Sequence, residues 1–271
     1  MKDGKWDVRI RRAQELAAAY PFASEGLRFY ERITGFQRSL YSDIRAACGS
    51  VKRNSPPGSL RQELDLFVLL PRIASFLSFV EANAPAPLAH SAGELRAQGT
   101  ARGQAVITEF WRAVPGSPSG LSAPDELLTW TFLQPYAEYL ADYTEPSAPV
   151  GTPSLCPLCL GRPQVGVLRQ EGDGAKRSLI CALCSTEWDY RRLVCPACEE
   201  EKVEKLAVYS AEEFSHVRVE ACDTCRCYIK TVNLTKDGRA VPVVDELATI
   251  PLNLWATEHG YVKLQNNLLG I

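Results

Sequence analysis

The sequence has little net charge and no long uninterrupted apolar run. Its 30 Lys and Arg residues nearly balance 32 Asp and Glu residues, so no overall basic charge favours binding to nucleic acid or anionic membranes. Residues 64–80 are the most apolar stretch, but Asp65, Pro71 and Arg72 interrupt them, so no membrane span is expected. The charged first residues lack the apolar segment of a secretory signal. We therefore expect a soluble, cytoplasmic protein.

Common catalytic signatures are also missing. The chain has no Walker loop, no glycine-rich dinucleotide fingerprint and no Ser-His-Asp spacing, and its 3 histidines are scattered. With 271 residues, 46% of them apolar and 23% charged, the chain is long enough to bury a core in one large domain or two smaller ones.

Residues 1–145 predict an all-α domain. Apolar residues recur every three or four positions over 27–44, which gives one apolar face of a helix. A capping-box pattern at 59–62 predicts the start of the next helix. Residues 64–80 are apolar nearly all round, so we expect them to form a central, buried helix that is kinked at Pro71.

Two further helices are expected over 93–113 and 124–141, after a Pro-rich loop at 84–87. Residues 122–125 read Ser-Ala-Pro-Asp, which places proline in the first turn of the second of these helices. Aromatic residues in this helix predict the core of a helical bundle. Residues 146–155 are rich in Pro, Ser and Gly and predict a linker.

Beyond the linker the chain changes to short runs rich in Val, Ile and Tyr, which predict short strands. These runs cover residues 165–168, 178–180, 206–209, 217–220 and 228–232. Residues 243–271 return to a helical pattern and predict a C-terminal helix and tail. The predicted fold class is α+β, with two small β units over 156–190 and 191–242 between the helical domain and this helix.

The cysteines are the most informative residues. Nine of the 10 cysteines lie between positions 156 and 227. Two residues between a pair of cysteines let the chain fold into a knuckle that directs both sulfurs at one point. Because a cytosolic chain keeps its thiols reduced, this density favours metal binding over disulfides. Eight of the cysteines form four Cys-x-x-Cys units: Cys156/Cys159, Cys181/Cys184, Cys195/Cys198 and Cys222/Cys225.

These units form an internal repeat. Residues 156–184 and 195–225 share the order Cys-Pro-x-Cys, strand, turn, strand and Cys-x-x-Cys, which is typical of a zinc ribbon or rubredoxin-like unit. The repeat favours consecutive pairing over a cross-braced pairing of the first unit with the third. The predicted metal ligands are therefore Cys156, Cys159, Cys181 and Cys184 in site 1, and Cys195, Cys198, Cys222 and Cys225 in site 2.

Two metal ions are expected as cofactors, and four thiolates suit zinc as well as iron. A metal site of this kind supplies folding free energy on the order of 10 kcal/mol. Since four cysteines leave no open coordination position, hydrolytic catalysis at the metal is not expected.

Charge argues against a nucleic-acid-binding zinc ribbon. Residues 156–271 contain 14 Lys and Arg residues and 16 Asp and Glu residues. Each four-thiolate site with a divalent ion would add a charge of about −2, because the thiolates outweigh the ion. Nucleic-acid-binding ribbons carry a basic patch instead, and Arg191 with Arg192 forms only a small one.

Three residues outside the motifs have structural interpretations. Cys48 lies at the end of an apolar helix face and is expected in the core. His216 lies in a predicted strand and is expected to be structural. Cys227 follows a predicted ligand by two positions, and we expect it to point away from the strand, with a spare ligand or an oxidation-sensitive thiol as alternatives.

Several stretches resemble the family of formate dehydrogenase accessory proteins named FdhE. The clearest is Leu-Ile-Cys-Ala-Leu-Cys-Ser-Thr-Glu-Trp at 179–188, which is similar to the family's C-x-L-C-x-T-E-W signature. The resemblance is detailed over about residues 156–267 and is only one of character in the helical half. Further matching stretches are 192–198, 219–225 with 228–230, 245–248 and 258–261.

The resemblance implies an accessory role in the cytoplasm. Members of the family are needed for active respiratory formate dehydrogenases and are thought to bind the catalytic subunit before its export. The cysteine motifs are important for this contact, the rubredoxin-like sites can hold iron, and no reaction of their own is known. The resemblance therefore implies a chaperone-like maturation protein whose partner is the catalytic subunit of a formate dehydrogenase, and which is not an enzyme.

Within the signature, Thr186, Glu187 and Trp188 are candidates for partner contact, because they lie close to a knuckle. The alternative is that Trp188 packs between the two metal units. Two other functional classes remain open: a rubredoxin-like electron-transfer or redox protein, and a nucleic-acid-binding zinc-ribbon protein.

Overall fold

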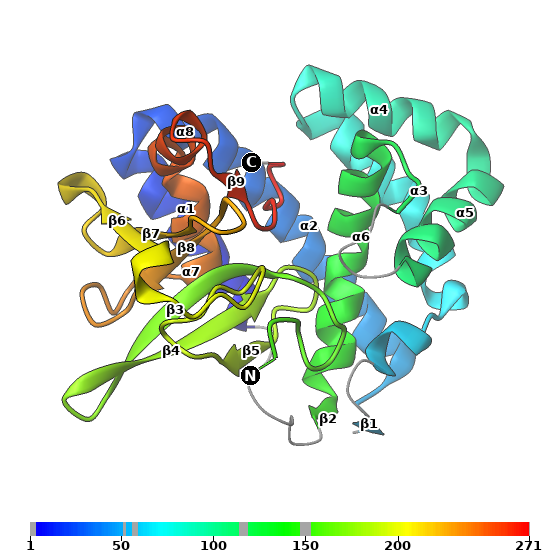
Figure 1. Ribbon diagram of the computed structural model, residues 1–271. Helices are drawn as coiled ribbons and strands as arrows, with labels where there is room; N and C mark the ends of the chain where they lie inside the picture. The colour runs from blue at the N-terminus through cyan, green and yellow to red at the C-terminus, as the bar shows by residue number, and fades with distance from the viewer. Residues whose placement is uncertain (1–3, 51–52, 56–58, 114–118, 147–152, 271) are drawn as a thin grey trace.

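The computed structural model describes residues 4–50, 53–55, 59–113, 119–146 and 153–270. Figure 1 shows a helical part on one side and a twisted sheet, covered by the C-terminal helices, on the other. The fold class is α+β, as the sequence predicts: a helical N-terminal region precedes a sheet that carries two groups of four cysteines.

The helical part contains six α-helices in the described residues. Helix α1 packs against α2 and also reaches across to the C-terminal helix α7, so the start of the chain joins both parts. A short 3₁₀ turn, η1 (Pro21–Ala23), connects α1 to α2. The bounds are α1 (Gly4–Ala19), α2 (Ser24–Cys48), α3 (Leu66–Asn83), α4 (Ala86–Ala97), α5 (Gly99–Arg112) and α6 (Ala123–Asp142).

The central helix of the bundle is α6, and the prediction that residues 64–80 would be buried all round is wrong. Helix α3 buries only one face, and Phe67 on the other face is 95% exposed. In α6 every residue from 128 to 140 is buried. Both helices contact α2, α4 and α5, but α6 is buried on all sides over 128–140, whereas α3 leaves one face exposed. Apolar composition predicts burial, but it does not say which helix the others surround.

Helix α3 is also, within the described ranges, the one helix whose length and composition would suffice for a membrane span. This is weak support for a span, because core helices of soluble proteins meet the same criterion. In this structure the buried face of α3 packs into the helical core through Leu69, Ile73 and Phe76.

Two helix starts follow local side-chain chemistry. Proline lies in the first turn of α6 as predicted, and Ser122 caps this helix, since its hydroxyl accepts a hydrogen bond from the Asp125 N–H (3.2 Å). The predicted start at 59–62 is wrong: these residues form a 3₁₀ turn, η2 (Ser59–Gln62). Helix α3 begins only after Asp65, whose carboxylate accepts from the Val68 N–H (3.2 Å).

The helix expected over 93–113 is two helices. Helix α4 begins already at Ala86, inside the predicted loop, with proline in its first turn. It ends at Ala97, and Gly99 follows with a φ of +80°, a backbone conformation that favours glycine. Helix α5 then continues in a new direction (Figure 1).

All five predicted strands are present, and they belong to one seven-stranded sheet. Its order is β5-β4-β3-β8-β7-β6, with the short β9 beside β8. The bounds are β3 (Pro163–Glu171), β4 (Gly174–Cys181), β5 (Glu187–Asp189), β6 (Leu206–Ser210), β7 (Val217–Cys222), β8 (Cys227–Asn233) and β9 (Val262–Lys263).

A separate parallel pair, β1 (Arg53–Ser55) with β2 (Thr144–Pro146), reaches the first residue of the predicted linker. Residues 147–152 of that linker lie outside the described residues.

The two repeats join through β3 and β8, which pair in parallel. Gly166 on β3 lies opposite Thr231 on β8, and a Cβ atom at Gly166 would overlap the Thr231 Oγ1 atom. Glycine therefore lets the two strands approach at this position. A buried ion pair adds to the junction, because Arg177 on β4 contacts Glu220 on β7 at 2.6 Å.

The predicted C-terminal helix is broken into α7 (Pro242–Ala248) and α8 (Ile250–Glu258). Pro251 lacks the N–H that a continuous helix would need at this position, so α8 starts anew after Thr249. Helix α7 packs between the sheet and α1. There Asp245 accepts from Arg12 (2.5 Å) and contacts His216 (2.9 Å), which is the structural role expected for this histidine.

Candidate metal centres

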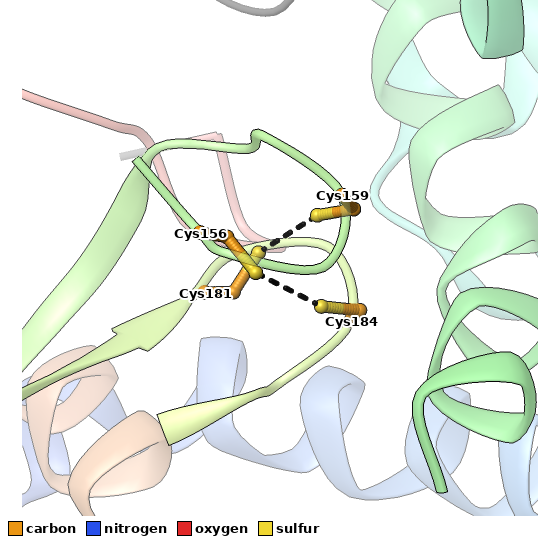
Figure 2. Close-up of side chains that lie close together, drawn as sticks. All are labelled: Cys156, Cys159, Cys181 and Cys184. Atoms are coloured by element: carbon orange, nitrogen blue, oxygen red, sulfur yellow. Dashed lines mark hydrogen bonds between the residues drawn. The ribbon is translucent and has the colours of Figure 1, made fainter. Parts of the chain in front are cut away.

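The first group of four sulfurs lies where the β3–β4 hairpin meets the helical part. In Figure 2 the side chains of Cys156, Cys159, Cys181 and Cys184 point toward one another from two facing knuckles. The Sγ atoms of Cys156 and Cys184 are 3.5 Å apart, and those of Cys159 and Cys181 are 3.4 Å apart. All four sulfurs lie within 4.8 Å of one another.

The second group has the same arrangement where β7 ends and β8 begins. The sulfurs of Cys195 and Cys225 are 3.7 Å apart, as are those of Cys198 and Cys222. The structure thus groups the sulfurs by consecutive pairing and not by the cross-braced alternative. None of the ten cysteines, all within the described ranges, forms a disulfide.

These distances fit a metal ion. A tetrahedral site with metal–sulfur bonds of about 2.3 Å has sulfur–sulfur edges of about 3.8 Å, close to the separations in both groups. Both clusters could therefore bind a metal ion, and four thiolate donors suit zinc or iron equally. In such a site every coordination position is taken by the protein.

The four knuckles share one backbone conformation. In each, the residue after the second cysteine has a positive φ between 54° and 60°, although none of the four is glycine. Its N–H donates to the carbonyl of the first cysteine, at 2.8 to 3.2 Å. The repeat seen in the sequence is therefore also a repeat of geometry. The four residues are Leu160, Ser185, Glu199 and Arg226.

Backbone N–H groups also point at the sulfurs. Gly161 donates to the Cys159 Sγ and Leu183 to the Cys181 Sγ, each at 3.4 Å. A Cβ atom at Gly161 would lie 3.1 Å from both sulfurs, so a side chain there would crowd the site. Such N–H groups stabilise thiolate charge, as a metal site requires.

The two groups differ in burial. All four cysteines of site 1 are buried, at 0 to 2% exposure. In site 2, Cys195 and Cys222 are buried, whereas Cys198 is exposed and Cys225 is half-buried. Site 1 is enclosed by the helical part, while site 2 lies at the outer end of the sheet.

One face of α6 encloses site 1. The Trp130 Nε1 and the Gln134 Nε2 both donate to the carbonyl of Ala182, between the two cysteines of the second knuckle, at 3.3 and 3.0 Å. The sequence predicts that the aromatic residues of this helix lie in the bundle core, and it does not predict this contact. Trp130, Gln134 and Glu138 recur every fourth position, so they lie on one face of α6. The sequence does not show that this face contacts the second knuckle of site 1.

A buried ion cluster completes the contact. Glu138 is 0% exposed, accepts from the Arg9 guanidinium (2.7 Å) and the Ser185 hydroxyl (2.7 Å), and forms an ion pair with the Lys5 ammonium (2.8 Å). Burial alone would raise the pKa of Glu138, but Arg9 and Lys5 outweigh it and lower this pKa to about 2. Arg9 also donates to Ser185 (3.0 Å), so α1, α6 and the knuckle meet at one point.

Without an ion, burial raises the pKa of some of the thiols in each group. Burial, together with hydrogen bonds from the neighbouring thiols, raises the pKa of Cys181 well above its ordinary value. Burial also raises the pKa values of Cys195 and Cys225. The Cys222 thiol differs: the N–H groups of Cys225 and Thr224 outweigh desolvation and lower its pKa. A bound cation would supply the missing charge compensation.

The three candidates for partner contact lie beside site 1 on one strand edge. The Thr186 hydroxyl contacts the Cys184 Sγ (3.1 Å). Glu187 on β5 pairs with Arg169 (2.8 Å) at the surface. The Trp188 ring is 6% exposed, and its Nε1 donates to a backbone carbonyl in the segment before site 1 (2.8 Å).

The other two cysteines are both half-buried. Cys48 packs against the helical core at the end of α2, as expected. Cys227, at the start of β8, lines a small cavity of about 40 Å³ together with Cys195 and Cys222. Its sulfur is not part of the second group.

Comparison with known proteins agrees with this geometry. Residues 155–192 match the family model described as FdhE, central domain, and residues 193–269 match FdhE, C-terminal domain. The fold also matches the crystal structure of the FdhE protein from Pseudomonas aeruginosa. That match has a TM-score of 0.69 and 25% identity over 99% of this chain and 96% of the other. Residues 155–269 thus match the FdhE family, and the whole chain has the fold of an FdhE protein.

Curated FdhE homologues extend the match to the helical part. The FdhE homologue from Aquifex aeolicus is 25% identical over 99% of this chain and 96% of its own length. The homologue from Pseudomonas aeruginosa is 39% identical, but only over 43% of this chain and 39% of its own length. The family models match residues 155–269, which contain all eight clustered cysteines.

Proposed function

We propose that this chain is an accessory protein of formate dehydrogenase maturation, which binds the catalytic subunit by protein–protein contact. The match to the FdhE family supports this proposal, since the resemblance described above implies such a role. The observation that carries it is the pair of closed four-sulfur clusters. They stabilise a domain and leave no coordination position for a substrate, as expected of a binding protein and not of a metalloenzyme.

The eight clustered cysteines are the proposed ligands of two ions, zinc or iron. A bound ion would contribute folding free energy and fix the knuckles, and the backbone N–H groups would orient the sulfurs. The reduced thiols that both sites need are consistent with work in the cytoplasm, before export of the partner.

The proposed partner contact includes the exposed edge of β5 beside site 1. Thr186 and Glu187 present polar groups there, and the buried ring of Trp188 packs beneath this surface. This surface lies on the knuckle that α6 holds, so its shape depends on the filled site 1.

A binding experiment tests the proposal. The metal-loaded chain is mixed with the purified catalytic subunit of a formate dehydrogenase from the same organism, and complex formation is measured by calorimetry. Saturable binding is expected, and the variants Glu187→Lys and Trp188→Ala should weaken it. Glu171→Lys, an exposed position on β3, is the matched control. Metal content is measured for every variant.

Two results are decisive. Absence of binding by the metal-loaded, folded chain would refute the accessory role. Binding that survives both the Glu187 and the Trp188 change, with metal content intact, would place the contact on another surface.

The exposure of site 2 favours one second candidate, a rubredoxin-like redox function. An iron ion held by Cys198 and its three partners would lie close to solvent, within reach of an electron donor. Iron with reversible reduction after native purification would support this candidate, and zinc would count against it.

A further inference from the structure

The outer edge of the sheet is open. Strand β6 pairs with β7 on one side, and none of the described residues pairs with its other side. The Asp223 N–H donates to the Lys205 carbonyl, which sets the alternation of the ladder. By that alternation, the N–H and C=O groups of Val208 and Ser210 point away from β7. An edge of this kind accepts a further strand.

A groove of about 830 Å³ runs beside this edge. Its walls are β6, the start of α8 and the turn between α1 and α2, and aromatic rings make up much of its surface. Phe22 is 54% exposed and Val208 is 55% exposed, while the Tyr209 and Trp255 rings contact each other at 4.4 Å between centroids. Apolar side chains projecting from an added strand would find contacts here.

The negative charge beside the edge of β6 favours a positively charged partner segment. Residues 199–213 contain six Glu and two Lys residues. Glu212 and Glu213 form η4 (Glu212–Phe214) directly after β6, are exposed, and have no ion-pair partner among the residues that the structure describes. Glu213 also lines the groove. A partner segment that carries Lys or Arg would therefore bind in the groove more tightly than a neutral or acidic one.

A second copy of this chain fits poorly. Symmetric antiparallel pairing of two β6 strands about Val208 would place Glu204 of each copy opposite Glu212 of the other, and like charges directly opposite are destabilising. The occupant favoured by charge is a different chain.

We propose that the open edge of β6 and its groove bind an extended segment of the partner protein. This segment adds a strand to the sheet, directs alternate apolar side chains into the groove and carries Lys or Arg next to Glu212 and Glu213. The inference rests on the proposed function only in taking the formate dehydrogenase catalytic subunit as the source of the segment.

The test uses a labelled synthetic peptide that alternates Val and Thr and carries two Lys at each end. Its binding to the metal-loaded chain is measured by fluorescence anisotropy. The double variant Glu212→Lys/Glu213→Lys should bind this peptide roughly tenfold more weakly. It should bind a matched peptide with Glu in place of Lys more tightly than the unchanged chain does. Val208→Pro, which removes an outward N–H but keeps the pairing with β7, should also weaken binding.

Each outcome has a defined meaning. Equal binding to both peptides by the unchanged chain, or no effect of Val208→Pro in a protein with intact metal content, overturns the inference. A dimer in sedimentation that Val208→Pro dissolves overturns it in favour of a second copy. If the catalytic subunit binds and these variants do not weaken it, the proposed function stands and this surface is wrong. If the peptide behaves as expected and the subunit does not bind, the surface stands and the proposed function fails.

Discussion

The contact between α1, α6 and site 1 depends on one buried carboxylate. Replacing Glu138 by Gln keeps its size and removes its charge, which leaves Arg9 and Lys5 facing a neutral amide. Arg9 has a side chain only 10% exposed, so solvent compensates little of the lost interaction. Breaking a buried ion pair on one side costs about 3–5 kcal/mol.

The pKa of Glu138 expresses the same interaction as a dependence of stability on pH. It is about 2 in the folded chain and 4.5 in its ordinary state. The unfolded chain therefore binds this proton more tightly, and the stabilisation is complete above pH 4.5 and is lost as the pH falls toward 2. The difference corresponds to roughly 3 kcal/mol at neutral pH, in agreement with the ion-pair value.

Urea unfolding at pH 7 with a fixed free zinc concentration checks this magnitude. With a urea dependence of roughly 3 kcal/mol per M, the midpoint of Glu138→Gln should fall by about 1 M. Glu94→Gln is the matched control: this helical Glu is 63% exposed and, among the residues that the structure describes, forms an ion pair only with an exposed His, so a change within about 0.5 kcal/mol is expected. A midpoint for Glu138→Gln equal to that of the control, with the same zinc content, would refute the argument.

Two further predictions concern the sites and the sheet. When excess pyridylazoresorcinol is added to the zinc-loaded chain, one equivalent should leave about tenfold faster than the other, because Cys198 is exposed and site 1 is enclosed. Cys198→Ser should abolish the fast step, and Cys156→Ser the slow one. Gly166→Ala should lower the unfolding free energy by roughly 2 kcal/mol or more, since its methyl group overlaps Thr231, whereas Gly174→Ala, which has space, should not.

Both predictions can fail clearly. Release of both zinc ions in one phase would show that burial does not control exchange. A Gly166→Ala variant as stable as Gly174→Ala would show that the junction of β3 and β8 is loose enough to accept a methyl group.

The sequence predicted the strands and both groups of sulfurs because their signals are local. Each Cys-x-x-Cys unit forms its own knuckle, and each pair of units is joined by a hairpin of adjacent residues. The start of α6 was predictable for the same reason, since Ser122 and Asp125 make the cap with no help from distant residues.

The arrangement of these pieces was not predictable from local pattern. The parallel pairing of β3 with β8 joins residues 65 positions apart in the chain, such as Val165 and Lys230. The sequence of neither strand indicates which strand it pairs with. The burial of α6 in place of α3 likewise depends on which helices surround it. Single residues caused the remaining errors: Gly99 divides one predicted helix, and Pro251 divides another.

The order in which the chain is synthesised gives the N-terminal helix a particular dependence. Arg9 donates to Ser185, which is 176 positions later in the chain, and Arg12 donates to Asp245, which is 233 positions later. A nascent chain on the ribosome can pair Arg9 with Glu138 once α6 has emerged, but Arg12 lacks Asp245 until almost all of the chain has been made. The contact of the first helix with α7 is therefore a late step, and a chain that stops short of α7 would bury Arg12 without its Asp245 partner.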